Sequence, residues 1–266
     1  MFSSSSIPDP WKHWLLHNRD RGCSLDDLTQ QAVAQGLDPI AVNMLLSSSE
    51  VAFPSLTQWF EPPMTKTNHQ PRAWKLDTSL AQIYELPALL NHDQCNELIE
   101  TINCSLRPST VTRGDSDYRT SRTCHLRHNT LDLTRYLDLR LAELMGVDPR
   151  FSEPLQGQRY DPGEYFREHT DWFAPDTNEF QKHTKPGGQR TWTVMIYLNS
   201  VDRGGETCFK KIGRCFSPCP GHALAWNNLH KDGTPNPFTL HEALPVKNGS
   251  KWIITKWFRA SMGRNG

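Results

Sequence analysis

The chain contains no long hydrophobic run. No stretch of its 266 residues approaches the ~20 consecutive apolar residues of a membrane-spanning helix. The opening residues, MFSSSSIPDP, also lack the basic start and apolar segment of a secretory signal. We therefore expect a cytoplasmic protein that has no membrane partner.

A net charge of either sign is missing as well. Lys and Arg together number 29, as do Asp and Glu, so the formal net charge is zero. Proteins that hold nucleic acid mainly through phosphate contacts need an excess of basic residues. The balance therefore argues against a nucleic-acid partner, and it leaves the oligomeric state open.

Paired cysteines are also scarce. The seven cysteines are an odd number, are scattered along the chain and belong to a protein too large to need disulfides for stability. We expect mostly reduced thiols. Cys215, Cys219 and His222 could form half of a zinc site, but without a second Cys pair they are better interpreted as loop and strand residues. Whether the two cysteines bind a metal is left open.

The first 70 or so residues predict a small helical module. Three short helices are expected, each with a capping residue or a proline at its start. They begin near Asp9, Ser24 and Asp38. A stretch with three prolines at 61–72 then indicates a linker. The chain is accordingly divided into a module at 1–70 and a second domain at 71–266.

The role of this helical module is left open by the sequence. It could present a substrate protein, mediate self-association or cap the second domain. Trp11 and Trp14 offer a criterion, because an exposed pair would favour peptide binding and a buried pair would favour packing.

The rest of the chain predicts helices followed by strands. Two amphipathic helices are expected from the apolar periodicity of 91–103 and 130–146. After Asp148, short strand-like runs alternate with Gly, Pro and Asn turns, which is typical of an antiparallel sandwich or barrel. The predicted fold is therefore mainly β with helices (α+β), and the helices pack on one side of an all-β core.

One short segment, Tyr160–Phe173, carries an imidazole and a carboxylate two residues apart. In a strand, residues i and i+2 point to the same face, so His169 and Asp171 would project together. A second histidine, His241, lies in another strand-like run. Two histidines and one carboxylate form the facial triad of non-haem Fe(II) oxygenases, which leaves open positions on the metal.

A turn signal, Asn248–Gly249, follows His241. It predicts a hairpin that returns Lys251 beside the strand carrying His241. Alternation would place five residues on one face of the returning strand: Lys251, Ile253, Thr255, Trp257 and Arg259. Lys251 would then offer a fixed cation inside the barrel for the far carboxylate of a 2-oxo acid.

In the order and spacing of these residues, the chain resembles the prolyl 4-hydroxylase family of 2-oxoglutarate- and Fe(II)-dependent dioxygenases. The matching residues are His169-x-Asp171, His241 and, ten residues later, Lys251. Neighbouring blocks such as GGQRTWTVMIYLN, GGETCF and KWIITKWF are similar too, so the resemblance covers roughly residues 80–260. It implies a double-stranded β-helix, or jelly roll, over about 150–262.

The resemblance also implies roles for individual residues. The iron ligands would be His169, Asp171 and His241. The residues around 2-oxoglutarate would be Lys251, Thr207, Tyr160 and Tyr197. The residues facing the substrate would be Arg190, Trp257, Arg119 and Arg259. No catalytic side chain is expected beyond the metal site.

The implied reaction is a hydroxylation. O2-dependent decarboxylation of 2-oxoglutarate would be coupled, through a ferryl intermediate, to insertion of oxygen into a C–H bond, with ascorbate as the reductant. Many relatives act on prolyl residues of peptides or proteins. Two departures suggest a changed substrate, because Phe166 stands where many relatives have tyrosine and Arg259 stands where many have histidine. An added cation would suit a substrate that bears a carboxylate.

Three alternatives stay open beside a peptidyl-proline hydroxylase. One is a hydroxylase of a free amino acid or a small natural-product peptide. Another is a peptide-binding jelly roll without turnover, against which the intact triad and Lys251 argue. The third is a nucleic-acid demethylase, against which the neutral charge argues.

Overall fold

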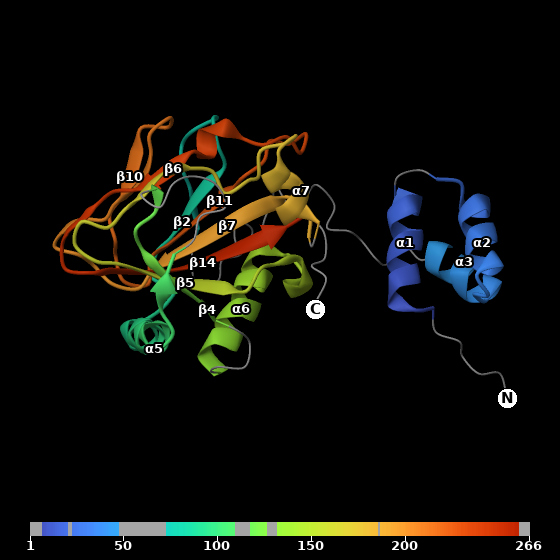
Figure 1. The fold of residues 1–266 in the computed structure, drawn as a ribbon, viewed down its shortest axis with the longest axis horizontal. Coiled ribbons are helices and arrows are strands. Elements are labelled where there is room, and N and C mark those ends of the chain that lie inside the picture. Colours follow the sequence, from blue (N-terminus) through green and yellow to red (C-terminus); the bar gives the residue numbers. More distant parts are fainter. Residues whose placement is uncertain are drawn as a thin grey trace. The chain divides into compact units, whose positions relative to one another are not determined.

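The computed structural model describes residues 7–20, 23–47, 73–109, 118–126, 132–185 and 187–260 (Figure 1). The chain divides into two units, Met1–Ser55 and Leu56–Gly266. The predicted boundary at residue 70 and the predicted linker at 61–72 lie outside the described residues. No helix in the described ranges is long and apolar enough to cross a bilayer.

The described part of the first unit is a bundle of three helices, as predicted. They are α1 (Asp9–Asp20), α2 (Leu25–Ala34) and α3 (Pro39–Ser47). Ser24 caps α2 by accepting a hydrogen bond from the backbone N–H of Asp27. Trp11 and Trp14 are half-buried, lie edge to face and pack against the apolar core of this unit. The pair is thus neither fully exposed nor fully buried, so it does not decide between peptide binding and packing.

The second unit contains two main β-sheets among its described residues, and their paired strands are antiparallel. The larger sheet has the strand order β1 (Trp74–Lys75), β2 (Ile83–Leu86), β11 (Ala223–Asn227), β7 (Arg190–Tyr197), β14 (Lys251–Arg259), β5 (Leu155–Tyr160), β4 (Arg122–Leu126) and β3 (Arg107–Pro108). The smaller sheet has the order β10 (Arg214–Phe216), β9 (Thr207–Phe209), β12 (His241–Ala243) and β6 (Phe166–His169). A further pair joins β13 (Val246–Asn248) to β8 (Arg203–Gly204).

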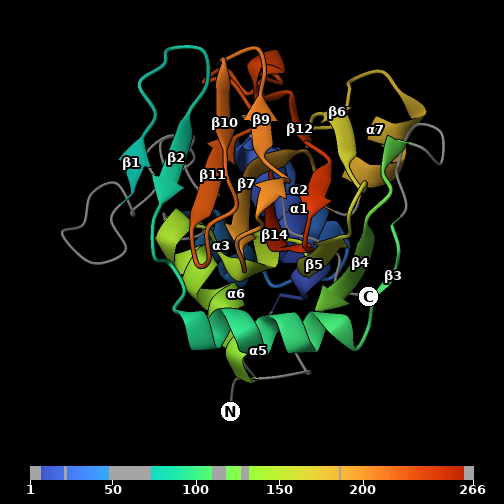
Figure 2. The same ribbon diagram turned by 90° about the vertical axis from the view of Figure 1, so that its left-hand side faces the viewer.

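A shared hydrophobic core joins the two main sheets. Figure 2 shows strands of the smaller sheet, β10, β9 and β12, in front of β11, β7 and β14 of the larger one. Successive side chains of a strand alternate between its faces, so every second residue of these strands enters the space between the sheets. The core residues include Met195, Tyr197, Leu224, Trp226 and Ile253 from the larger sheet, and Phe209 and Ala243 from the smaller one. This is the predicted jelly-roll arrangement.

Two helices pack on the outer face of the larger sheet, as predicted. They are α5 (His92–Asn103) and α6 (Asp132–Met145), which lie together below the strands in Figures 1 and 2. A capping box of Asn91 and Gln94 begins α5. The helix comes so close to β5 that a Cβ on Gly157 would lie 2.5 Å from Ile102. The shorter α7 (Asn178–Thr184), η3 (Pro149–Phe151) and η4 (Pro237–Thr239) complete the described helices.

The predicted hairpin after His241 is wrong. The Asn248–Gly249 turn ends β13, but the next strand, β14, pairs with β5 and β7 in the larger sheet. Every residue of β14 is buried, and such a strand needs neighbours on both edges and cover on both faces. Lys251 and His241 therefore come from opposite sheets and approach each other across the core.

Most cysteines are free, as expected, but one pair forms a disulfide that was not predicted. Cys208 of β9 and Cys215 of β10 lie opposite each other in register and form a disulfide. A bonded Cys215 has no thiolate to offer, so the half zinc site with Cys219 and His222 is not formed. In the described part of the chain, Cys23, Cys95, Cys104, Cys124 and Cys219 are free.

Candidate active site

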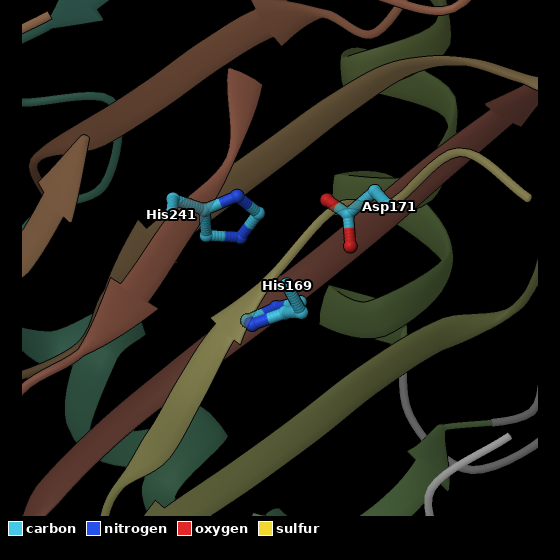
Figure 3. Close-up of side chains that lie close together, drawn as sticks. All are labelled: His169, Asp171 and His241. Atoms are coloured by element: carbon cyan, nitrogen blue, oxygen red, sulfur yellow. The ribbon is translucent and has the colours of Figure 1, made fainter. Parts of the chain in front are cut away.

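The predicted triad is assembled at the edge of the smaller sheet. His169 ends β6 and His241 begins β12, and these two residues are direct partners in the antiparallel register. Asp171 follows β6 by two residues. One ligand atom from each of the three side chains lies within 4.8 Å of the others, and Figure 3 shows the three side chains converging. Among the described residues, this is the group suited to hold a metal ion.

Both histidines are held in one tautomer by the backbone. His169 Nδ1 lies 2.8 Å from the carbonyl oxygen of Arg167, and His241 Nδ1 lies 2.9 Å from that of Thr239. A carbonyl oxygen only accepts hydrogen bonds, so each Nδ1 carries the proton. Each Nε2 therefore keeps a lone pair for a metal, which is the usual arrangement of a histidine ligand.

The surroundings of His169 keep its imidazole unprotonated and therefore able to bind a metal ion. Burial, and then the neighbouring His241, lower the pKa of His169 well below its usual value, so its imidazole is neutral at neutral pH. Aromatic rings surround the pair: Phe166 stacks on His169 at a centroid distance of 3.5 Å, and Trp226 lies 4.9 Å from His241. Two imidazoles and one carboxylate whose ligand atoms lie this close together are the ligand set of a facial Fe(II) site.

Lys251 places a buried amine in the same cavity. Its side chain is fully buried, its Nζ donates to the Gly205 carbonyl oxygen at 2.9 Å, and it lies 4.4 Å from the centre of the Tyr160 ring. Burial lowers the pKa of Lys251 to about 7, although Glu206 acts in the opposite direction. No carboxylate among the described residues forms an ion pair with this amine. It is therefore suited to an anionic ligand.

Several other predicted residues line this cavity together with the two histidines. They are Arg119, Tyr160, Thr207, Lys251 and Trp257. Arg119 is 9% exposed and lies 4.7 Å from the centre of the Phe166 ring, and its Nε donates to Ser121 Oγ. The Tyr160 hydroxyl donates to Gln158 at 2.8 Å, and burial raises the pKa of Tyr160.

Arg190 and Arg259, which were predicted to face the substrate, contact the carboxylate of Glu153 and do not line the cavity. Arg190 makes a bidentate pair with Glu153, with distances of 2.6 and 2.8 Å, and stacks 3.9 Å over the Trp257 ring. Arg259 contacts the same Glu153 and donates to two backbone carbonyl oxygens, of Gly188 and His183. Although burial opposes it, the two arginines hold the pKa of Glu153 below its usual value.

A bulge in β14 explains the position of Arg259. The register against β7 is regular from Ile253 to Trp257 and then shifts before Arg259. The alternation that brings Lys251, Ile253, Thr255 and Trp257 to the cavity is broken at that point. The predicted common face is thus confirmed for these four residues and is wrong for Arg259.

Tyr197 also lies outside the cavity of the triad. It lines a second cavity, at residues that include Glu85, Phe216 and His222, and its hydroxyl donates to the Phe216 carbonyl oxygen at 3.1 Å. The prediction that Tyr197 lines the 2-oxoglutarate pocket is therefore not supported by its position.

Some residues of the cavity wall were missed in the sequence. Gln158, Met195 and Trp226 line the cavity beside the triad. The first two lie two residues from Tyr160 and Tyr197, so strand alternation could have indicated them. Trp226 had no such signal, because nothing local links β11 to the histidines.

Comparison with known proteins agrees with this geometry. Residues 155–259 match the model of a family described as the 2OG-Fe(II) oxygenase superfamily. The chain is 31% identical over 186 residues to the "Putative prolyl 4-hydroxylase" of Acanthamoeba polyphaga mimivirus, covering 69% of this chain and 76% of that protein. It is 32% identical over 194 residues to prolyl 4-hydroxylase 5 of Arabidopsis thaliana, covering 64% and 65%.

A solved structure shares the fold. The viral collagen prolyl hydroxylase of Paramecium Bursaria Chlorella virus-1, crystallised with 2OG, aligns with a TM-score of 0.55 at 24% identity. The alignment covers 66% of this chain and 95% of that one. The part of the chain that aligns is large enough to contain the whole jelly roll.

Proposed function

This chain belongs to the prolyl 4-hydroxylase-like part of the 2OG-Fe(II) oxygenase superfamily, and from that membership we propose that it hydroxylates a prolyl residue within a peptide or protein. It is a 2-oxoglutarate- and Fe(II)-dependent dioxygenase that uses O2. The observation that carries the proposal is that His169 and His241 share one cavity with the buried amine of Lys251, and that Asp171 completes the triad beside them.

Each part of the site has a task in this reaction. His169, Asp171 and His241 would hold Fe(II), which together with 2-oxoglutarate and O2 supplies the oxidising power for C–H hydroxylation. Lys251 would pair with the distal carboxylate of 2-oxoglutarate, with the hydroxyls of Thr207 and Tyr160 nearby. A charged hydrogen bond inside a buried cavity both binds this co-substrate and fixes its orientation.

The substrate side of the cavity offers hydrogen-bond donors. The Trp257 indole N–H is buried and has no partner among the described residues, and the Arg119 guanidinium has no carboxylate partner there. A prolyl residue has no backbone N–H, so at that position the peptide backbone offers only a carbonyl acceptor. Donors on the enzyme and acceptors on the peptide are complementary, which supports a peptidyl substrate.

The contacts of Arg259 weaken the alternative of a substrate that bears a carboxylate. That alternative relied on a free cation at this position. The guanidinium instead contacts Glu153 and two backbone carbonyl oxygens. A small-molecule substrate is therefore the less favoured candidate.

The test is succinate release by purified protein supplied with Fe(II), ascorbate and 2-oxoglutarate. A panel of proline-containing peptides should stimulate release, and the matched peptides with alanine in place of proline should not. The stimulated peptide should gain one oxygen by mass at the proline. Stimulation by free amino acids alone would contradict the peptidyl assignment.

The metal assignment has its own variants. His169→Ala should abolish succinate release because it removes a ligand, whereas His125→Ala, at an exposed histidine of β4, should retain it. Full activity of His169→Ala would exclude the triad as the iron site.

A further inference from the structure

Asp171 is the last acceptor in a row of buried side chains. The Thr193 hydroxyl lies 2.7 Å from Asp171 Oδ2, and Asn228 Nδ2 lies 2.9 Å from Thr193 Oγ1. Thr193 and Asn228 are fully buried, and Asp171 is 5% exposed. Asp171 follows β6 of the smaller sheet, whereas Thr193 lies in β7 and Asn228 follows β11, both of the larger sheet. The row therefore connects the two sheets at the triad.

The two hydrogen bonds of this row run in the same direction, from Asn228 through Thr193 to Asp171. An amide nitrogen only donates, so Asn228 Nδ2 occupies an acceptor site on Thr193 Oγ1. The hydroxyl has a single proton, which it donates to Asp171 Oδ2. This hydrogen bond to Oδ2 restrains rotation of the carboxylate, and no hydrogen bond from a described residue occupies Oδ1. The histidines have a similar restraint, because a backbone carbonyl occupies the nitrogen that does not face the metal.

The backbone holds Asn228 in place from both sides. Its N–H donates to the Thr191 carbonyl oxygen at 2.7 Å, and its own carbonyl oxygen accepts from the Asn236 N–H at 2.9 Å. These bonds fix the main chain from which the Asn228 side chain reaches Thr193.

This arrangement has a cost that packing alone does not explain. Asn228 Oδ1 is buried and has no hydrogen-bond partner among the described residues. An unsatisfied buried amide oxygen lowers stability, and an apolar residue would avoid that loss. A polar residue at this position is better explained by the donor that it supplies to Thr193.

We propose that Asn228 and Thr193 are positioning residues, which orient the Asp171 carboxylate so that one of its oxygens is presented to the metal ion. Neither residue belongs to the triad or lines the cavity. The inference rests on the proposed function, since it requires the triad to bind a metal. In other metal sites, removal of a side chain that hydrogen-bonds a ligand typically changes metal affinity by about 10- to 100-fold.

The experiment is a metal titration of the apoprotein with Co(II), in competition with a chromophoric chelator. Thr193→Val replaces the hydroxyl with a methyl group of similar size and should weaken Co(II) binding by about 10- to 100-fold. Thr193→Ser keeps the hydroxyl and should bind nearly as the original protein does. The visible spectrum of bound Co(II) should change in the valine variant, because the carboxylate is no longer restrained.

Thr191→Val is the matched control. Thr191 lies on the same strand, is 1% exposed and donates its hydroxyl to the Phe258 carbonyl oxygen instead of a metal ligand. Thermal unfolding of the apoprotein should show a similar loss of stability for both valine variants, but only Thr193→Val should lose metal affinity. Equal Co(II) affinity of Thr193→Val and the original protein, or an equal loss in Thr191→Val, would overturn the proposed positioning role. An original protein that binds no metal would overturn the proposed function as well.

Discussion

At the scale of single residues, Lys251 carries an electrostatic penalty on folding. It is fully buried, and burial lowers its pKa to about 7. Because the pKa in the folded state lies below that of an unfolded lysine, the unfolded chain binds the proton more tightly. The penalty on folding is complete below about pH 7 and disappears as the pH rises through the usual pKa of lysine. An anionic ligand explains why an amine stands there in place of an apolar side chain.

The first prediction concerns the binding of 2-oxoglutarate as a function of pH. Above about pH 7 the amine is neutral and must take up a proton to pair with a carboxylate. Affinity should therefore fall by up to about tenfold for each pH unit above 7. Anaerobic calorimetry of the metal-loaded protein, in two buffers of different ionisation enthalpy, should detect proton uptake at alkaline pH and much less at acidic pH.

Lys251→Met is the control for this measurement. The variant should bind 2-oxoglutarate weakly at every pH and should show no proton uptake above pH 7. Proton uptake that persists in Lys251→Met would assign the titration to a different group.

At the scale of secondary-structure elements, the β9–β10 hairpin is closed by a covalent bond. Cys208 and Cys215 are seven residues apart, and their disulfide lies next to Thr207, which lines the cavity. A cross-link restricts the unfolded chain, and this loss of entropy favours the folded state. The hairpin that carries Thr207 is thus held more firmly than three-residue strands alone would allow.

We predict that Cys208→Ser/Cys215→Ser lowers the free energy of unfolding by about 2–3 kcal/mol, the value expected for so short a loop. Urea unfolding followed by tryptophan fluorescence would measure this change. Cys104→Ser, at an exposed free cysteine, should stay within about 0.5 kcal/mol of the original protein. Equal stability of the double variant and the original protein would mean that the bond contributes nothing in solution.

At the scale of the whole molecule, the active site exists only because two sheets face each other. The triad comes from the smaller sheet, and Lys251 and Tyr160 come from the larger one. A metal ion alone would be held by the triad, which lies in and directly after strands of the smaller sheet. A 2-oxoglutarate molecule that binds both the metal and Lys251 would connect the two sheets.

The joint effect of the two ligands on thermal unfolding follows from this arrangement. Mn(II) and 2-oxoglutarate together should raise the melting temperature by more than the sum of their separate effects, since each ligand increases the affinity of the other. Lys251→Met should retain the increase caused by Mn(II) and lose the additional increase caused by 2-oxoglutarate. Strictly additive shifts in the original protein would contradict the bridging arrangement. Differential scanning fluorimetry under nitrogen is sufficient for the measurement.

The sequence by itself determined the features that depend on local spacing. The two-residue spacing correctly predicted that His169 and Asp171 lie together, although β6 ends at His169, and strand alternation explains why Lys251 and Trp257 line one cavity. The amphipathic helices and their caps follow equally from neighbours along the chain. The resemblance to prolyl 4-hydroxylases rested on these local blocks, and it predicted the jelly roll correctly.

Only the tertiary structure decided which distant segments meet. The Asn248–Gly249 turn predicted a hairpin, but β14 is buried along its whole length and pairs with β5 and β7. The Cys208–Cys215 bond, the departure of Arg259 from the cavity face and the row from Asn228 to Asp171 likewise depend on register between strands. Alternation fixes the faces of one strand, whereas the choice of its neighbours depends on the burial and hydrogen bonding of the whole sheet, which no local pattern contains.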